Sequence, residues 1–255
     1  MKKFGIIVQA RTGSKRFPNK ILKKINKISI LEFLIKRLLL CFKNKEIFVA
    51  TTTKKNDQKI VNIAKNFNLK FYRGSEDDVS LRYLNCAKKY KIKNIIRLTS
   101  DCPLIDPFLI LKMKKKFYVN KLDYLANTLP LIKSTFPNGS DIEIFTFKAL
   151  KKSREYLDKE IHKPSIEHVT NIFWREKNLF KSKIFTQKIN QNRYKFSLDY
   201  KSDFNLIKYI IFNLKKKKIF GNTNQIIDII KNNKKFKRLS ILSNKRGHKK
   251  RKDLI

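Results

Sequence analysis

The stretch FGIIVQARTGSKRFPNK, residues 4–20, indicates how this chain folds. Residues 4–8 form a short apolar run rich in β-branched side chains, which is typical of a buried strand. Polar and small residues at 9–13 end that run, so the sequence predicts a strand followed by a basic loop. Glycine lets a backbone approach a ligand closely, and hydroxyl and cationic side chains bind phosphate. The loop therefore favours an anion site, and a solvated basic loop is the alternative.

Beyond this loop, strand patterns and helical patterns alternate along the first part of the chain. Apolar residues recur at helical spacing after Ser29, which is placed to cap a helix, and again from Val79. This alternation predicts an α/β fold with a largely parallel sheet covered on both faces and ligands at the carboxyl ends of the strands. The strands are expected at 4–8, 46–51, 69–72 and 94–98.

The second part of the chain gives weaker patterns. Asp106 and Pro107 form a helix start, with a capping carboxylate before a proline of the first turn. Further strands are expected at 122–126 and at 141–145, the latter with outward acidic residues, and a last helix at 223–230. Extended segments are expected at 184–188 and 194–198.

The composition indicates a folded protein with a large positive charge. The formal net charge is +41, and 42% of the residues are hydrophobic. Such a charge raises nucleic acid as a partner. The excess is mostly lysine, alongside many isoleucines, asparagines and phenylalanines, and all four have A/T-rich codons. We therefore expect solvated lysines, no specific nucleic-acid partner, and only salt-sensitive non-specific binding to polyanions.

Three features of the sequence predict a protein of the cytoplasm. The apolar start is interrupted by Gln9 and Arg11, which argues against a signal peptide. The longest hydrophobic region, 28–42, carries Glu32 and other charges, so no membrane insertion is expected. The three cysteines are odd in number and widely separated, which fits neither a disulfide framework nor a metal cluster.

Acidic residues at predicted strand ends or in loops are the candidates for metal binding. Asp101 and Asp199 each follow an apolar run that would place them near the sheet edge of the basic loop. Carboxylates and substrate phosphate oxygens together are a usual environment for Mg²⁺. Asp141 and Glu143 form a second acidic pair. A turn or helix-cap role is the ordinary alternative for a loop aspartate.

Seven sequence blocks follow one another along the chain: QARTGSKRFPNK (9–20), VATT (49–52), RGSEDDVSLRY (73–83), RLTSDCPLIDP (97–107), FPNGSDIEIF (136–145), EHVT (167–170) and SLDYKSD (197–203). In this order they resemble the cytidylyltransferases that activate sugar acids, of the spore-coat polysaccharide biosynthesis protein F type. The acylneuraminate and 3-deoxy-manno-octulosonate enzymes are related. The resemblance covers about four-fifths of the chain and gives little support to its end.

The resemblance implies a Rossmann-like three-layer nucleotide-diphospho-sugar transferase fold, often dimeric, and a Mg²⁺-dependent reaction between CTP and a small acidic sugar. It implies catalytic roles for Arg11, Lys20 and Asp101, and metal binding by Asp101 and, more loosely, by Asp199. The nucleotide-binding candidates are Gln9, Ala10, Arg11, Gly13, Ser14, Arg16, Lys20, Asp78 and Arg82, and the sugar-binding candidates are Asp141, Glu143, Glu167 and His168.

Several of these assignments have ordinary alternatives. Asp78 and Arg82 could form an ion pair one helical turn apart. Glu167 and His168 could be a helix cap and a packed histidine. Within the basic loop, Lys15 is expected to be solvated.

The predicted organisation is a nucleotidyltransferase domain over 1–231 and a basic C-terminal tail over 232–255 that could be mobile. The predicted function is transfer of CMP from CTP to a sugar acid, such as a nonulosonate, with release of pyrophosphate, for surface polysaccharide. One alternative is a transferase of the same fold that uses another nucleotide or a sugar phosphate. The other is a non-catalytic polyanion-binding protein.

Overall fold

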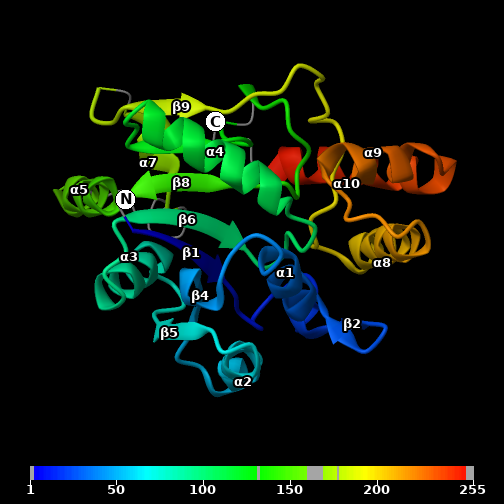
Figure 1. Cartoon of the computed structure of the whole chain (residues 1–255), viewed down its shortest axis with the longest axis horizontal. Coiled ribbons are helices and arrows are strands. Elements are labelled where there is room, and N and C mark those ends of the chain that lie inside the picture. The colour runs from blue at the N-terminus through cyan, green and yellow to red at the C-terminus, as the bar shows by residue number, and fades with distance from the viewer. Residues whose placement is uncertain (1–2, 131–132, 160–168, 177, 251–255) are drawn as a thin grey trace.

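A computed structural model of the chain describes residues 3–130, 133–159, 169–176 and 178–250, with the side chains of 157–159 and 248–250 left aside. Its centre is a seven-stranded sheet with the strand order β5-β4-β1-β6-β8-β7-β9 (Figure 1). The strands are β1 (Phe4–Gln9), β4 (Ile47–Thr52), β5 (Lys70–Gly74), β6 (Asn94–Thr99), β7 (Tyr124–Ala126), β8 (Glu143–Thr146) and β9 (Ser182–Ile184). A small hairpin of β2 (Lys24–Ile25) and β3 (Ile28–Ser29) lies outside it.

The sheet is mostly parallel, as the alternating patterns predict. Strands β5, β4, β1 and β6 run parallel, and β7 is parallel to β9. Only β8 is antiparallel to its neighbours β6 and β7. The carboxyl ends of β1, β4 and β6 therefore meet at one edge, and the loops that follow these strands lie next to one another.

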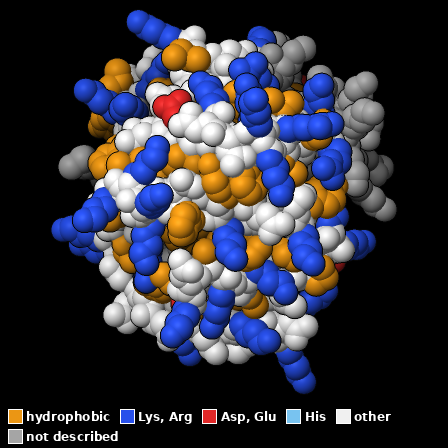
Figure 2. Space-filling view, turned by 90° about the vertical axis from the view of Figure 1, so that its right-hand side faces the viewer, with side chains coloured by type: hydrophobic (Ala, Val, Ile, Leu, Met, Phe, Trp, Pro, Cys, Tyr) orange, Lys and Arg blue, Asp and Glu red, His pale blue; other side chains and the backbone are white. Residues whose placement is uncertain are grey.

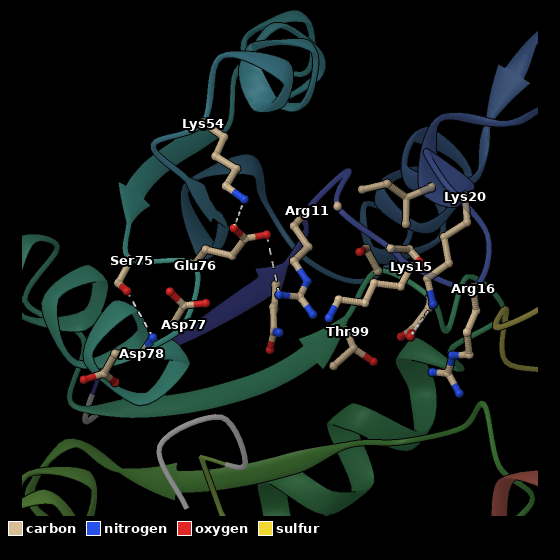
Figure 3. A pocket seen from close by; sticks show the side chains of 16 residues that line it. Arg11, Lys15, Arg16, Lys20, Lys54, Ser75, Glu76, Asp77, Asp78 and Thr99 are labelled. Carbon is tan, nitrogen blue, oxygen red and sulfur yellow. Dashed lines mark hydrogen bonds and ion pairs between the residues drawn. The ribbon is translucent and has the colours of Figure 1, made fainter. Parts of the chain in front are cut away.

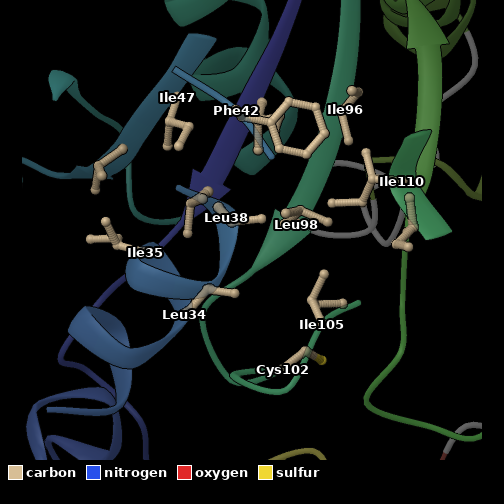
Figure 4. Packing of buried hydrophobic residues seen from close by; sticks show 14 of the residues in the cluster. Leu34, Ile35, Leu38, Phe42, Ile47, Ile96, Leu98, Cys102, Ile105 and Ile110 are labelled. Carbon is tan, nitrogen blue, oxygen red and sulfur yellow. The ribbon is translucent and has the colours of Figure 1, made fainter. Parts of the chain in front are cut away.

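Helices cover both faces of the sheet, because side chains of a strand alternate between faces. Ile6 and Val8 of β1 belong to a cluster with α1, α2 and α4, part of which Figure 4 shows. Ile7 belongs to the cluster on the other face, with α3, α5 and α7. These helices are α1 (Ile30–Leu38), α2 (Gln58–Asn66), α3 (Val79–Lys89), α4 (Pro107–Val119), α5 (Phe147–Lys159) and α7 (Asn171–Arg175).

The predicted helix starts at Ser29 and Asp106 are confirmed. Ser29 forms a capping box with Glu32 at the start of α1. The Asp106 carboxylate accepts hydrogen bonds from the backbone of Phe108 and Leu109 in α4. Such caps satisfy N–H groups that have no partner inside the helix. They also fix where α1 begins, directly after β3, and where the loop between β6 and α4 ends.

The last part of the chain forms a third cluster at one end of the sheet. It contains α8 (Lys201–Lys216), α9 (Thr223–Lys231) and α10 (Lys234–Lys250), and the expected helix at 223–230 is confirmed by α9. Where the sequence predicts a basic tail, the structure has α10, which packs against α8 and α9. Its inner face combines the buried polar residues Ser240, Ser243 and Asn244 with the partly buried Phe236, Leu239 and Ile241, which pack against the third cluster. None of the helices in the described part of the chain is long and apolar enough to cross a membrane.

Two expected features of the second half differ in the structure. The segment 194–198 forms only an isolated bridge between Lys195 and Asn138. The prediction of outward acidic residues in the strand over 141–145 is wrong for Glu143, which is 2% exposed. Glu143 forms an ion pair with Arg97 of β6 and accepts a hydrogen bond of 2.8 Å from the Tyr124 hydroxyl. A buried carboxylate needs such partners, and the neighbouring strands supply them.

Candidate functional site

A cavity of about 1050 Å³ lies at the carboxyl edge of the parallel strands (Figure 3). The loop after β1 forms one wall and the loop 75–78, between β5 and α3, forms another. Predicted site residues that line it are Gln9, Arg11, Gly13, Ser14, Arg16, Lys20, Asp78 and Asp101. Further lining residues are Lys15, Lys54, Ser75, Glu76, Asp77, Thr99 and Ser100.

Lys20 lies between two carboxylates at one end of this cavity. Its Nζ is 2.9 Å from Asp101 Oδ2 and 3.6 Å from Asp199 Oδ1, and it donates a hydrogen bond of 2.5 Å to the Leu198 carbonyl. Burial disfavours the ammonium, but the carboxylates of Asp101 and Asp199 outweigh it and raise the pKa of Lys20. Burial likewise opposes ionisation of Asp101, but Lys20 holds the pKa of that carboxyl well below its usual value. Lys20 and Asp101 are therefore both charged at neutral pH.

Arg16 extends the same charge cluster. Its guanidinium pairs with Asp199 Oδ1 at 2.9 Å, and about half of the side chain is accessible. Burial opposes its charge, but Asp199, Tyr200 and Asp101 together outweigh burial, so the pKa of Arg16 is raised. The sequence predicts an extended segment before Asp199 that leads to the sheet edge. In the structure this segment is not part of the sheet, so Asp199 does not follow a strand. It still reaches the predicted place beside the basic loop, from the turn before α8.

The two carboxylates fit a hard divalent cation. Asp101 and Asp199 both lie within 3.6 Å of one ammonium nitrogen, so a small cation could be shared between them in the same region. In the described part of the chain no group of three or more His, Cys, Asp or Glu side chains could hold a metal. Phosphate oxygens of a substrate would therefore have to complete the coordination, which is common for Mg²⁺.

A buried aspartate that sequence reasoning missed fixes the shape of the basic loop. Asp57 is 1% exposed and accepts hydrogen bonds from the Thr12 N–H at 2.8 Å and the Thr12 hydroxyl at 2.6 Å. Its other oxygen accepts from the hydroxyls of Thr51 and Thr52 at the end of β4. Burial opposes its ionisation, but these hydrogen bonds prevail and lower the pKa of Asp57. The threonines of VATT were a sequence signal for such a partner.

The opposite wall of the cavity is acidic, and it contacts the basic loop. Glu76 forms ion pairs with Lys54 and, at 3.8 Å, with Arg11 (Figure 3). A Cβ on Gly13 would lie 2.9 Å from Glu76 Oε1. The absence of a side chain at Gly13 therefore allows the two walls to approach closely. The predicted approach of its backbone to a ligand stays a prediction. Glu76, Ser75 and Asp77 were not among the sequence candidates.

Some predicted nucleotide-binding residues do not line the cavity. Ala10 is buried, and Arg82 is 1% exposed and donates a hydrogen bond to the Ser75 carbonyl. Arg82 therefore supports the acidic wall from behind. Asp78 lines the cavity and caps α3, but its ion pair is with Arg154 at 2.8 Å rather than with Arg82.

Of the predicted sugar-binding residues, the structure describes Asp141 and Glu143, which have different surroundings. The Asp141 carboxylate accepts hydrogen bonds from the Thr128 hydroxyl and the Gly139 N–H, and it lies 3.6 Å from Cys102 Sγ. Cys102 is also 3.8 Å from Asp101 Oδ1, so Asp141 is close to the Asp101 end of the site. Burial raises the pKa of the Cys102 thiol well above its usual value, so the thiol stays protonated. Glu143 is buried, and Glu167 and His168 lie outside the described residues.

Comparison with known proteins gives consistent matches. A family model described as cytidylyltransferase matches residues 5–236. An uncharacterised protein of Methanocaldococcus jannaschii is 40% identical over 71% of this chain and 70% of its own. The spore coat polysaccharide biosynthesis protein SpsF of Bacillus subtilis is 26% identical over 79% of this chain and 83% of its own.

Solved structures agree with these sequence matches. A cytidylyltransferase from Leptospira borgpetersenii has a TM-score of 0.84 at 33% identity, covering 92% of this chain and 97% of that one. A CMP:2-keto-3-deoxy-manno-octonic acid synthetase complexed with CTP has a TM-score of 0.63 at 14% identity, covering 83% and 99%. The second likeness concerns the fold alone. Since the family model spans nearly the whole sequence, this chain belongs to the cytidylyltransferase family and is a nucleotidyltransferase.

Proposed function

We propose that this cytidylyltransferase transfers CMP from CTP to a sugar acid, with release of pyrophosphate, to activate the sugar for surface polysaccharide. The observation that carries the proposal is the position of Lys20 between Asp101 and Asp199, beside Arg16 and at one end of a cavity that Arg11 also lines. Cationic side chains beside a paired carboxylate site suit a triphosphate with its metal ion. The Bacillus subtilis relative, named for spore coat polysaccharide biosynthesis, supports the pathway class.

In this proposal a sugar hydroxyl attacks the α-phosphorus of CTP in line, and pyrophosphate leaves. The P–O bond to the sugar forms as the bond to the β-phosphate oxygen breaks, and the hydroxyl proton passes to solvent. The protein contributes positioning and charge neutralisation rather than a nucleophile. Arg11, Arg16 and Lys20 hold phosphate oxygens, and the backbone at Gly13 lets the chain approach them.

Asp101 and Asp199 would hold Mg²⁺, which neutralises phosphate charge and orients the leaving group when bound. Lys20 Nζ, which lies 2.9 Å from Asp101 Oδ2 and 3.6 Å from Asp199 Oδ1, would hold a phosphate oxygen beside that ion. Asp141, near Asp101 through Cys102, remains a candidate for contact with the sugar.

The test is pyrophosphate release from CTP in Mg²⁺ with a panel of 2-keto sugar acids. We expect turnover with one panel member and not with the same sugars reduced at the keto group. Calorimetry with CTP, UTP, GTP and ATP gives the nucleotide preference, and CTP should bind most tightly. The proposal fails if no sugar acid supports release and CTP does not bind in Mg²⁺.

The same measurements separate the alternatives. Tighter binding of another nucleotide, or turnover only with a sugar phosphate, would indicate a transferase of the same fold with other substrates. Binding of RNA that survives Arg11→Ala, without turnover, would indicate a polyanion-binding protein. We also propose a homodimer, which light scattering of the purified protein tests.

A further inference from the structure

A buried lysine outside the cavity forms an ion pair with Asp199, one of the two carboxylates beside Lys20. Lys195 is 1% exposed, and its ammonium is 2.7 Å from Asp203 Oδ2 and 3.2 Å from Asp199 Oδ2. It also donates hydrogen bonds to the Ser197 carbonyl at 3.0 Å and the Ser243 hydroxyl at 3.2 Å. An ammonium has three donors, so Lys195 is fully engaged.

Asp203, in the first turn of α8, holds the backbone of Asp199. Its Oδ2 accepts hydrogen bonds from the backbone N–H groups of Asp199 at 2.9 Å and Tyr200 at 3.0 Å. Its Oδ1 accepts a hydrogen bond of 2.6 Å from the Ser243 hydroxyl. Asp199 is therefore held at its backbone by Asp203 and at Oδ2 by Lys195. Its Oδ1 is the oxygen that faces Arg16 and Lys20.

Helix α10 anchors the whole arrangement. The Lys195 N–H donates to the Ser240 hydroxyl oxygen at 2.8 Å, and that hydroxyl donates to the Lys195 carbonyl at 2.8 Å. Ser243, one turn later, reaches Lys195 and Asp203. Ser240 and Ser243 belong to a helix that follows the last motif block, 197–203. They hold Lys195 in place, and Lys195 in turn holds Asp199.

A buried ion pair of this kind is not required for stability alone. Replacing such a pair by apolar side chains of similar volume is often neutral or stabilising, because both charges lose their hydration. By contrast, mutation of a residue that orients a metal-binding carboxylate commonly lowers metal affinity or activity by about 10- to 100-fold.

We propose that Lys195 is a positioning residue. Together with Asp203 of α8 and Ser243 of α10, it orients Asp199 Oδ1 toward the metal and triphosphate. This inference rests on the proposed function. It assigns a role in the reaction to the C-terminal helix, which has no residue in the cavity.

The test measures Mn²⁺ binding in the presence of CTP, by electron paramagnetic resonance, alongside pyrophosphate release. Lys195→Met should weaken Mn²⁺ binding about tenfold and lower kcat about 10- to 100-fold, with KM for CTP at saturating metal changed by less than about threefold. Lys195→Arg, which keeps the charge, should recover part of both losses. Lys245→Ala, an exposed lysine of the same helix, is the matched control and should behave as wild type.

Ser243→Ala keeps the proposal testable if Lys195→Met does not fold. It removes one hydrogen bond to Asp203 and should weaken Mn²⁺ binding by about threefold or more. Mn²⁺ binding and kcat unchanged in folded variants, with only the melting temperature lowered, would overturn the inference while the proposed function stands. Wild-type protein that neither binds CTP with Mn²⁺ nor releases pyrophosphate would overturn the proposed function, and the inference with it.

Discussion

Single residues of the loop after β1 differ in what they contact, although most of them are basic. Arg11 pairs with Glu76, Arg16 with Asp199, and Lys20 with both Asp101 and Asp199. Lys15 is exposed, in agreement with the expectation of a solvated side chain, and it also lines the cavity. Charge alone thus does not rank these residues, but their partners across the cavity do.

Arg11→Ala and Lys15→Ala test this ranking directly. Arg11→Ala should lower kcat/KM for CTP about 10- to 100-fold, because a hydrogen bond to a charged group is worth about 1.5–3 kcal/mol. Lys15→Ala should change it by less than about threefold, as expected for a screened side chain at the cavity mouth. Pyrophosphate release at subsaturating CTP gives both values. Equal small losses for the two variants would contradict the ranking.

At the scale of elements, hydrogen bonds between loops assemble the site. Asp57 precedes α2, yet it binds Thr12 after β1 and Thr52 at the end of β4. Gly139, at a φ of 110°, donates its N–H to Asp141, and a Cβ there would lie 2.7 Å from the Ser197 backbone nitrogen. Both residues join segments far apart in the sequence.

Asp57→Asn should destabilise the protein by about 2 kcal/mol at pH 7, because several hydrogen bonds to a buried carboxylate weaken. The pKa of Asp57 is lower in the folded protein, so its contribution is present above the unfolded-state pKa, about 3.9. It is lost as the pH falls through the folded-state pKa. The stability difference between wild type and Asp57→Asn should therefore shrink below about pH 4.

Urea unfolding at pH 7, 5 and 3.5 measures that difference. Ser29→Ala, which removes the cap of α1 outside this network, is the control and should cost about 1 kcal/mol at each pH. A difference for Asp57→Asn that stays constant down to the lowest pH would show that the ionised carboxylate is not what stabilises the loop.

At the scale of the whole molecule, the large positive charge is not concentrated in one stripe on the face that Figure 2 shows. Figure 2 shows Lys and Arg side chains scattered among hydrophobic and other groups over one face, rather than gathered in a single stripe. With a formal net charge of +41, self-repulsion and attraction to any polyanion are both expected. Neither requires a defined nucleic-acid site.

Raising NaCl from about 50 to 200 mM should weaken binding to single-stranded RNA by at least about 100-fold, because binding releases counterions from many phosphates. Binding of CTP with Mg²⁺ should weaken by less than about tenfold, because its contacts are few and partly shielded from solvent. Fluorescence anisotropy with labelled RNA and calorimetry with CTP provide the two affinities. RNA binding that persists at 200 mM salt would point to a specific surface.

The sequence by itself determined the parallel half of the sheet and the loop after β1. Apolar runs of strand length and helical periodicity are local signals, and Ser29 and Asp106 mark helix starts without reference to the rest of the chain. The apolar runs before Asp101 and Asp199 predicted that both lie near the basic loop, although they are far apart in sequence, and the family resemblance added a metal-binding role for each.

Only the tertiary structure decided which polar residues face the cavity and which are buried partners. Glu143 pairs with Arg97, Asp57 holds Thr12, and Lys195 meets Asp203 across the start of α8. The sequence does not show whether a charged side chain is solvated or buried. Its role is fixed by the partners that compensate its lost hydration, and distant segments supply those partners when the chain folds.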